Sequence, residues 1–298
     1  MRVLVTGSEG FIGKRLVPEL HVKGHEVTRW DRTLDPKLMD LVSPQGLRYA
    51  LSACDAVVHL AANADVRGGW SDPTKDLHVN VVATHNLLEA MRKTETRRLV
   101  FASSAAVYGE GKGRRQDVPG WPKPVIPVRE TWHAKQTSLY GASKLAAEAF
   151  IGAYVEAGHL SASVLRFVSL LGPGYAHGHV VDFVKRLRED PTSLEILGFG
   201  TTERSYVDVD DAVQAICLVL EGDPGWEVLN VGTDHTLTSK DSARLICDYL
   251  GVDPEFSFTG ESWRGDHDIL LDATQLRKRG WSPRYTIRES LTRTLEAL

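Results

Sequence analysis

The residues with the clearest chemical potential are a tyrosine and a lysine four positions apart, Tyr140 and Lys144. In a helix this spacing places both side chains on one face. A nearby ammonium group favours the phenolate, so we expect Lys144 to lower the pKa of Tyr140 from its ordinary value of about 10. Tyr140 would then accept a proton from a substrate hydroxyl. By itself the spacing also fits a half-buried tyrosine followed by a surface lysine.

A glycine-rich turn near the N-terminus indicates what lies beside that base. The apolar segment 2–6 leads into three glycines spaced as Gly-x-x-Gly-x-x-Gly. Such glycines permit a tight bend between a strand and a helix and let the backbone approach a pyrophosphate, which then lies at the positive end of the helix, here predicted over 11–23. The cofactor-binding residues predicted from this turn are Gly7, Gly10, Phe11, Ile12 and Gly13.

An acidic residue after the second expected strand selects the dinucleotide. Strand 26–30 ends at Asp31, eighteen residues beyond Gly13. A carboxylate there accepts hydrogen bonds from a ribose diol and repels a 2′-phosphate, which favours NAD over NADP. Arg32 follows directly and leaves NADP as the alternative.

Composition fits a soluble enzyme. Hydrophobic residues make up 42% and charged residues 25% of the 298 positions, and the formal net charge of −4 offers no reason to expect nucleic acid or an anionic membrane as partner. No apolar run approaches the roughly 20 residues that span a bilayer, and no signal-peptide pattern precedes the first strand, so we expect a cytoplasmic protein. Cys54, Cys217 and Cys247 are widely spaced, which favours reduced core thiols over disulfides or metal ligands.

The order of the expected elements predicts the fold. Strands 3–6, 26–30, 37–41, 56–60, 98–102 and 162–167 are separated by helices that include 79–93 and the helix carrying Tyr140, with only a short crossover before 56–60. Alternation of this kind predicts an α/β fold, a Rossmann-type doubly wound parallel sheet, with a smaller α/β C-terminal lobe for substrate. We assign 1–168 to the NAD-binding domain, to which the chain returns around 205–232, and 169–298 mainly to the substrate lobe.

Several blocks outside the glycine turn resemble one family. They are Asp55-Ala-Val-Val-His-Leu-Ala-Ala62, Asn80-Val-Val-Ala-Thr-His-Asn-Leu-Leu-Glu-Ala90, Phe101-Ala-Ser-Ser-Ala-Ala-Val-Tyr-Gly109, Leu165-Arg-Phe167, Gly172-Pro-Gly174, Arg204-Ser-Tyr-Val-Asp-Val-Asp-Asp211 and Leu229-Asn-Val-Gly232. Over nearly its whole length the chain is similar to the extended short-chain dehydrogenases/reductases, in particular the NAD-dependent nucleotide-sugar epimerases and dehydratases of the UDP-galactose 4-epimerase type.

The resemblance implies roles for individual residues. Ser104, Tyr140 and Lys144 correspond to the catalytic triad, with Ser104 on the reacting oxygen and Lys144 on the nicotinamide ribose. The adjacent Ser103 is placed on the cofactor side, although sequence does not decide which serine points inward. Further cofactor contacts implied are Asp40 and Leu41 at the adenine, Leu60, Ala61 and Ala62 beneath the pyrophosphate and ribose, and Phe167.

The implied reaction is epimerisation at C4 of a nucleotide-sugar, with Tyr140 as base, a transient 4-keto sugar, and NAD that is regenerated in each cycle. Dehydratases acting at C4 and C6 carry Asp-Glu where this chain has Ala105 and Ala106, which disfavours that reaction. An acid from elsewhere, such as Glu110 or Glu130, would permit a 5,6-elimination. The alternative of another class is an inactive NAD-binding sensor or scaffold.

The implied substrate is a UDP-hexose or UDP-N-acetylhexosamine. Ala105, Ser169, Arg204 and Arg264 are its predicted contacts besides Ser104, with both arginines expected on the diphosphate. Ser169 stands where the family usually has asparagine. Arg67 and the Pro- and Arg-containing segment 111–125 are candidates for specificity, the segment being either a lid or a tolerated surface insertion.

Two further expectations concern metals and assembly. His177 and His179 suggest a metal pair by spacing, but no carboxylate or cysteine cluster accompanies them, so we interpret them as solvated loop histidines and expect no metal. The resemblance implies a homodimer in which the helices carrying Asn80 and Tyr140 form a four-helix bundle. Their apolar residues Leu87, Leu88, Ala146, Ala147 and Phe150 permit this contact, or equally packing within one subunit.

Overall fold

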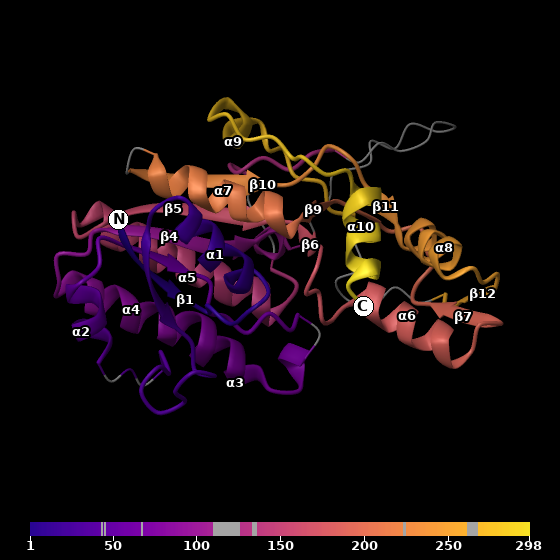
Figure 1. Ribbon diagram of the computed structural model, residues 1–298, viewed down its shortest axis with the longest axis horizontal. Helices are drawn as coiled ribbons and strands as arrows, with labels where there is room; N and C mark the ends of the chain where they lie inside the picture. Colours follow the sequence, from indigo (N-terminus) through magenta and orange to yellow (C-terminus); the bar gives the residue numbers. More distant parts are fainter. Residues whose placement is uncertain are drawn as a thin grey trace.

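The protein is described by a computed structural model, which covers residues 1–42, 44, 46–66, 68–109, 126–132, 136–222, 225–260 and 268–298. Its centre is a six-stranded sheet in the order β10-β5-β4-β3-β1-β2, in which every neighbouring pair is parallel (Figure 1). The strands are β1 (Arg2–Thr6), β2 (Glu26–Trp30), β3 (Ala56–His59), β4 (Arg98–Ser104), β5 (Ser161–Phe167) and β10 (Trp226–Val231). This confirms the predicted Rossmann-type fold.

Alternating apolar residues explain why both faces of the sheet are covered. Along β1, Val3 and Val5 pack on one side with α1 (Gly13–Val22) and α7 (Val209–Glu221), while Leu4 packs on the other. That second layer contains α2 (Leu47–Ser52), α4 (Ala83–Arg92) and α5 (Leu139–Glu156). A strand exposes successive side chains to opposite faces, so an uninterrupted apolar run requires a helical layer on each side. Parallel strands then end at one common edge, where the site forms.

Three parts of the first half differ from the sequence predictions. Residues 37–41 form turns among the described residues instead of a third strand, because Asp35 accepts hydrogen bonds from the backbone N–H groups of Lys37 and Leu38 and starts an Asx turn. The crossover that was expected to be short contains the six-residue helix α2. The helix predicted over 79–93 begins earlier, as α3 (Pro73–Asp76) and a π-helical stretch η2 (Leu77–Val82) that continue into α4.

The C-terminal part builds a smaller α/β lobe beside the sheet edge (Figure 1). Its core joins α6 (His179–Glu189), α8 (Ser239–Leu250) and α10 (Ile287–Glu296) through residues such as Phe183 and Ile246. Its short strands are β6 (Ser169–Leu171) with β9 (Tyr206–Asp208), β7 (Ser193–Ile196) with β12 (Glu255–Phe258), and β8 (Glu203–Arg204) with β11 (Leu237–Thr238). The remaining elements are η1 (Gly68–Trp70), η3 (Ala105–Tyr108) and α9 (Thr274–Lys278).

The order of the elements along the chain does not match their division between the main sheet and the lobe, which matters for the assignment of domains. After β5 the chain enters the lobe, and it returns to the main sheet in β10, which pairs with β5. The assignment of 1–168 and 169–298 to two domains stays a prediction. Within the described ranges, no helix combines the length and the apolar character needed to cross a membrane.

Candidate functional site

A cavity of about 970 Å³ lies at the carboxyl edge of the main sheet, between the sheet and the lobe. Its wall includes the glycine turn, the end of β4, the first two turns of α5, and residues of the segment 167–182. The volume falls in the range of small-molecule sites. The predicted residues that line it are Gly7, Gly10, Phe11, Ile12, Gly13, Leu60, Ala62, Ser103, Ser104, Ala105, Tyr140, Lys144, Phe167, Ser169 and Arg204.

The glycine turn is a cradle that side chains would fill. A Cβ atom added to Gly13 would lie 2.3 Å from the carbonyl oxygen of Gly7, and one added to Gly7, whose φ is +69°, would lie 2.7 Å from the backbone nitrogen of Ala61. Both distances are far inside van der Waals contact. The turn therefore requires glycine at these positions, and its backbone faces the cavity where a pyrophosphate would meet the start of α1. These residues fit a dinucleotide.

Asp31 follows β2 and is fixed by backbone contacts. Its carboxylate accepts hydrogen bonds from the N–H of Glu9 at 3.1 Å and from the N–H and hydroxyl of Thr33 at 2.9 and 2.8 Å. Partial burial raises the pKa of Asp31, but these hydrogen bonds outweigh it and leave the pKa below the ordinary value. The group is therefore an anion at neutral pH, as the preference for NAD requires. Asp31 is not among the residues that line the cavity.

Tyr140 lies in the first turn of α5, buried, with its ring on the cavity wall. Burial raises the pKa of its hydroxyl to about 12, while a hydrogen bond with Ser104 acts in the opposite direction. The expectation that the protein lowers this pKa through Lys144 is therefore wrong. The spacing does place both side chains on the cavity, but the ammonium group points elsewhere.

Lys144 explains the difference. Its Nζ donates a 2.7 Å hydrogen bond to the carbonyl of Ala102 and lies 4.5 Å from the centre of the Phe101 ring. Burial lowers the pKa of Lys144 to about 8, and the carboxylate of Glu148 opposes that change. Lys144 thus carries a weakly held proton at the cavity wall and is held by β4 rather than by Tyr140.

The two adjacent serines are separated by the alternation of strand β4. Ser104 faces the cavity, hydrogen-bonds with Tyr140 and caps η3 by accepting from the N–H of Ala106 at 3.2 Å. Ser103 is buried and donates to Glu148 at 2.5 Å, although part of it still reaches the cavity wall. Glu148 is itself held by both ends of the Arg166 guanidinium. The serine beside the candidate base is therefore Ser104.

Besides Asp31, three predicted cofactor contacts do not line the cavity. Leu41 is buried in the second layer beside Trp30, and Asp40 accepts a hydrogen bond from the N–H of Val42 at 2.9 Å. Both residues lie in the turn region that replaces the expected strand. Ala61 presents its N–H to the hydroxyl of Thr6 at 3.3 Å. Their contact with a cofactor stays a prediction.

The substrate side of the cavity contains most of the expected residues. Ser169 from β6, Arg204 from β8 and Ala105 from η3 line it, and no described residue of η3 contributes a carboxylate. Glu130 is committed elsewhere, because its carboxylate accepts from the N–H of Asn230 at 2.9 Å. Arg264, Arg67, Glu110 and the segment 111–125 lie outside the described residues.

Sequence reasoning missed part of the lobe side of the cavity. Tyr175, His177 and His179 line it, together with Asp182, Ser205 and Tyr206, and Thr137 and Ser138 add to the wall just before α5. Ala64, Asp65 and Val66, next to the predicted Arg67, also line the cavity. His179 is the first residue of α6 and contacts the hydroxyl of Ser242 at 2.9 Å, so its interpretation as a solvated loop residue is wrong. His177 is exposed and stacks on Tyr175. Among the described residues, no cluster of His, Cys, Asp and Glu is arranged to hold a metal. The Gly-Tyr-Ala-His-Gly-His motif that opens the lobe was the available signal.

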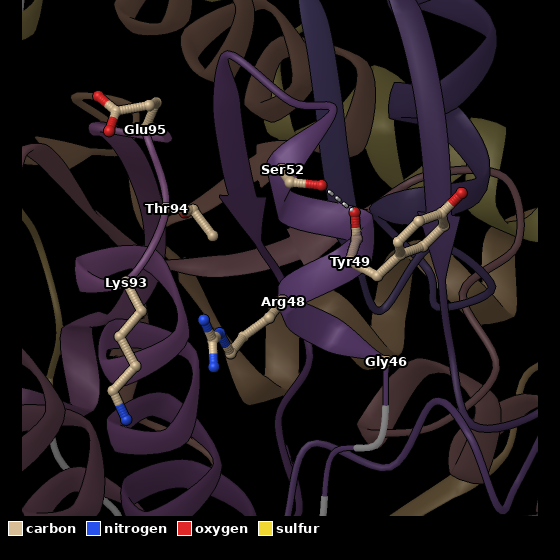
Figure 2. A pocket seen from close by; sticks show the side chains of 7 residues that line it. All are labelled: Gly46, Arg48, Tyr49, Ser52, Lys93, Thr94 and Glu95. Atoms are coloured by element: carbon tan, nitrogen blue, oxygen red, sulfur yellow. Dashed lines mark hydrogen bonds between the residues drawn. The ribbon is translucent and has the colours of Figure 1, made fainter.

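A second hollow, of about 630 Å³, lies between α2 and the loop after α4 (Figure 2). Its side chains are Arg48, Tyr49, Ser52, Lys93, Thr94 and Glu95, with Gly46 at its margin. None of the predicted site residues lies there, and Arg48 and Tyr49 are exposed surface residues. We therefore place the candidate site in the first cavity.

Comparison with known proteins agrees with this geometry. Residues 3–232 match the model of the NAD dependent epimerase/dehydratase family. A UDP-glucose 4-epimerase of Mycolicibacterium smegmatis is 30% identical over 321 residues, covering 99% of this chain and 98% of that protein. A dTDP-glucose 4,6-dehydratase of the same organism is 28% identical over 327 residues, covering 99% and 92%. The solved structure of MoeE5 in complex with UDP-glucuronic acid and NAD is 31% identical with a TM-score of 0.87, covering 100% and 98%.

Proposed function

The chain belongs to the NAD dependent epimerase/dehydratase family, and we propose that it is an NAD-dependent nucleotide-sugar 4-epimerase. The observation that carries the proposal is one cavity in which the hydrogen-bonded pair Ser104 and Tyr140, together with Lys144, faces the glycine turn. A base that meets the cofactor and a sugar hydroxyl at one point is what reversible oxidation of that sugar requires. The relatives with this fold that bind UDP-sugars support the class of substrate.

Each residue has a chemical task in this proposal. When bound, NAD would supply the oxidising centre and the positive charge of its nicotinamide ring. Tyr140 takes the proton of the sugar 4-hydroxyl and returns it after the sugar has turned, while Ser104 hydrogen-bonds the same oxygen. Lys144, held at Ala102, binds the ribose hydroxyls of the cofactor. Arg204 on the lobe side holds the diphosphate.

The wall beside Ser104 favours epimerisation over dehydration. Ala105 and Ala106 present methyl groups to the cavity where a 4,6-dehydratase needs an acid and a base. Glu130, one source of an acid for 5,6-elimination, is bound to the backbone of Asn230 instead. The carboxylates that do line the cavity among the described residues are Asp65 and Asp182, so dehydration through one of them is the second candidate.

We also propose a cytoplasmic homodimer assembled through α4 and α5. Phe150 on α5 is 42% exposed and contacts His85 of α4 in a tilted ring pair 5.7 Å apart, which leaves an apolar surface on this helix pair. Leu87, Leu88 and Ala147 are buried within the subunit and are unavailable for that contact. The three cysteines are unpaired and buried, in keeping with a reducing compartment.

The test is to incubate the protein with UDP-hexoses and to compare it with Tyr140→Phe. We expect an isomer of unchanged mass from the wild type, and a loss of turnover of about 10²- to 10⁴-fold in the variant, because the base is removed. Tyr154→Phe is the matched control, since it changes another tyrosine on α5 whose hydroxyl donates to Glu89. Near-normal turnover in Tyr140→Phe would remove Tyr140 from the mechanism, and a product lighter by one water would replace epimerase by dehydratase.

A further inference from the structure

A buried carboxylate beside the candidate base has no role in the mechanism above. Asp76 ends α3 just before the π-helical stretch η2, and it is only 1% exposed. Its Oδ1 accepts a 2.7 Å hydrogen bond from the side-chain amide of Asn63. Its Oδ2 has no hydrogen-bond partner among the residues that the structure describes. A buried polar atom without a partner is rare in proteins and calls for an explanation.

The unpartnered oxygen lies beside Gly69 of η1, which packs against the first turn of α5. A Cβ atom added to Gly69 would lie 3.1 Å from Oδ2 of Asp76 and 3.4 Å from Cβ of Leu139, the residue before Tyr140. Gly69 therefore packs closely against both the carboxylate and the start of α5. The N-terminal end of α5 carries partial positive charge, which is favourable for a carboxylate near it.

A chain of hydrogen bonds links this carboxylate to the backbone of Tyr140. The side-chain amide of Asn80 approaches Oδ1 of Asp76 at 3.4 Å and donates to the hydroxyl of Ser143 at 2.9 Å. Ser143 donates in turn to the carbonyl of Tyr140 at 2.8 Å. We call Asn63, Asp76, Asn80 and Ser143 the Asp76 cluster. The cluster fixes the carboxylate relative to the base.

We propose that Asp76 is a positioning residue whose unbalanced buried charge sets the pH at which Tyr140 releases its proton. A negative charge near a phenol disfavours the phenolate. Asp76 acts on the pKa of Tyr140 in the raising direction, with a smaller effect than burial, which also raises it, and than the hydrogen bond with Ser104, which lowers it. In the proposed function, Asp76 thus keeps Tyr140 protonated when no compensating positive charge faces it.

Other charged groups on the elements around the start of α5 do not replace Asp76. These groups are His59, Lys75, His78, His85, Glu89, Arg92, Arg98, Lys144, Glu148 and Arg166, and the loop residue Asp65 lines the same cavity. Lys144 is bound at Ala102, and Glu148 is paired with Arg166. Glu89 is paired with Arg92, and His78 is exposed. Asp76 remains the buried carboxylate near the start of α5 with an oxygen that has no hydrogen-bond partner among the described residues.

The inference rests on the proposed function, but its test measures the ionisation of Tyr140 and not turnover. In NAD-loaded protein carrying [ζ-¹³C]tyrosine, the carbon-13 signal of Tyr140 is assigned by its loss in Tyr140→Phe and followed against pH. We expect Asp76→Asn to ionise Tyr140 about one pH unit lower than wild type, since a like charge has been removed. Asp72→Asn, the same change at an exposed position four residues earlier, is expected to leave the titration unchanged.

The pH profile of turnover separates this inference from the proposed function. The acid limb of kcat is expected to move to lower pH in Asp76→Asn and to stay in place in Asp72→Asn. A shifted signal in protein that turns over no nucleotide-sugar would overturn the function and keep the inference. Active protein with Tyr140 titrating as in wild type would overturn the inference alone. If Asp76→Asn does not fold, Asp76→Ala is titrated in its place, with the same two outcomes.

Discussion

Two buried polar clusters contact helix α5, and they differ in how their charge is balanced. The Asp76 cluster lies at the first turn of the helix. The Glu148 cluster, made of Ser103, Tyr108, Glu148, Arg166 and Asn230, lies two turns further on. Glu148 and Asp76 are 4% and 1% exposed, so both carboxylates have lost nearly all contact with water. What distinguishes them is the partner of each oxygen.

In the Glu148 cluster every carboxylate oxygen is matched. One oxygen accepts from Ser103 at 2.5 Å and from Nε of Arg166 at 3.0 Å, and the other accepts from Nη2 of Arg166 at 2.6 Å. The Arg166 guanidinium also donates to the hydroxyl of Tyr108 at 2.9 Å. A fully satisfied ion pair of this kind fixes the geometry of the sheet and α5. We therefore assign a structural role to the Glu148 cluster and control of the ionisation of Tyr140 to the Asp76 cluster.

The largest expected effect comes from breaking the matched pair. Glu148→Gln leaves the Arg166 guanidinium buried without its counter-charge, and we expect unfolding in urea to require about 3–5 kcal/mol less free energy than in wild type. Asp253→Asn provides the control, because it removes one charge of the exposed pair Arg244–Asp253 and should change this value by less than about 1 kcal/mol. A loss below that of the control would show that the Glu148 cluster is not a structural ion pair.

The second-largest effect is expected from His59, a buried histidine next to the Asp76 cluster. It is a candidate counter-ion for Asp76, but its ring is neutral. Nε2 of His59 contacts the hydroxyl of Thr84 at 3.0 Å, which donates to the carbonyl of Asn80 at 2.6 Å, while Nδ1 contacts the hydroxyl of Thr6 at 2.6 Å. A neutral ring satisfies all three bonds. Burial, with a smaller contribution from the charge of Lys144, lowers the pKa of His59 to about 3.

The sign of the resulting pH dependence follows from which state binds the proton. Below pH 6.5 the unfolded chain protonates His59 and the folded protein does not, so stability falls as the pH falls. Between pH 6.5 and 4.5 we expect this residue to account for about 2 kcal/mol of lost unfolding free energy. Urea unfolding at both pH values measures it. His59→Asn should lose this part of the pH dependence, and His78→Asn, at an exposed position, should keep it. If the unfolding free energy of His59→Asn depends on pH as in wild type, the ring of His59 is charged in the folded protein.

The fold was predictable because its signals are local. The glycine at 13 is required by backbone contacts with Gly7 and Ser8 of the same turn, and Asp31 follows its strand directly. The strand predicted at 37–41 was wrong because an apolar residue such as Leu41 can be buried when it lies in a turn as well as when it lies in a strand. There the Asx turn at Asp35 decided the conformation.

The electrostatics of the site were not predictable from spacing. The four-residue interval between Tyr140 and Lys144 predicts a shared helix face, but not that the ammonium group would bind the carbonyl of Ala102. Burial, which depends on the packing of distant segments, then determines both pKa values. Asp76 was hidden for the same reason. In the sequence it follows Asp72, Pro73 and Lys75 and has the character of an exposed helix start, whereas η1 and α5 cover it in the fold.

The smallest expected change in stability, and the one that sharpens the comparison most, is that of Asp76→Asn. It is the same carboxylate-to-amide exchange as Glu148→Gln at an equally buried position. The amide oxygen keeps the bond from Asn63, and the amide nitrogen takes the place of an oxygen that had no partner among the described residues. One unmatched group replaces another, so we expect the unfolding free energy in urea to stay within about 1 kcal/mol of wild type. A loss as large as that of Glu148→Gln would show that Asp76 is matched by a partner in solution, and the contrast between the two clusters would then disappear.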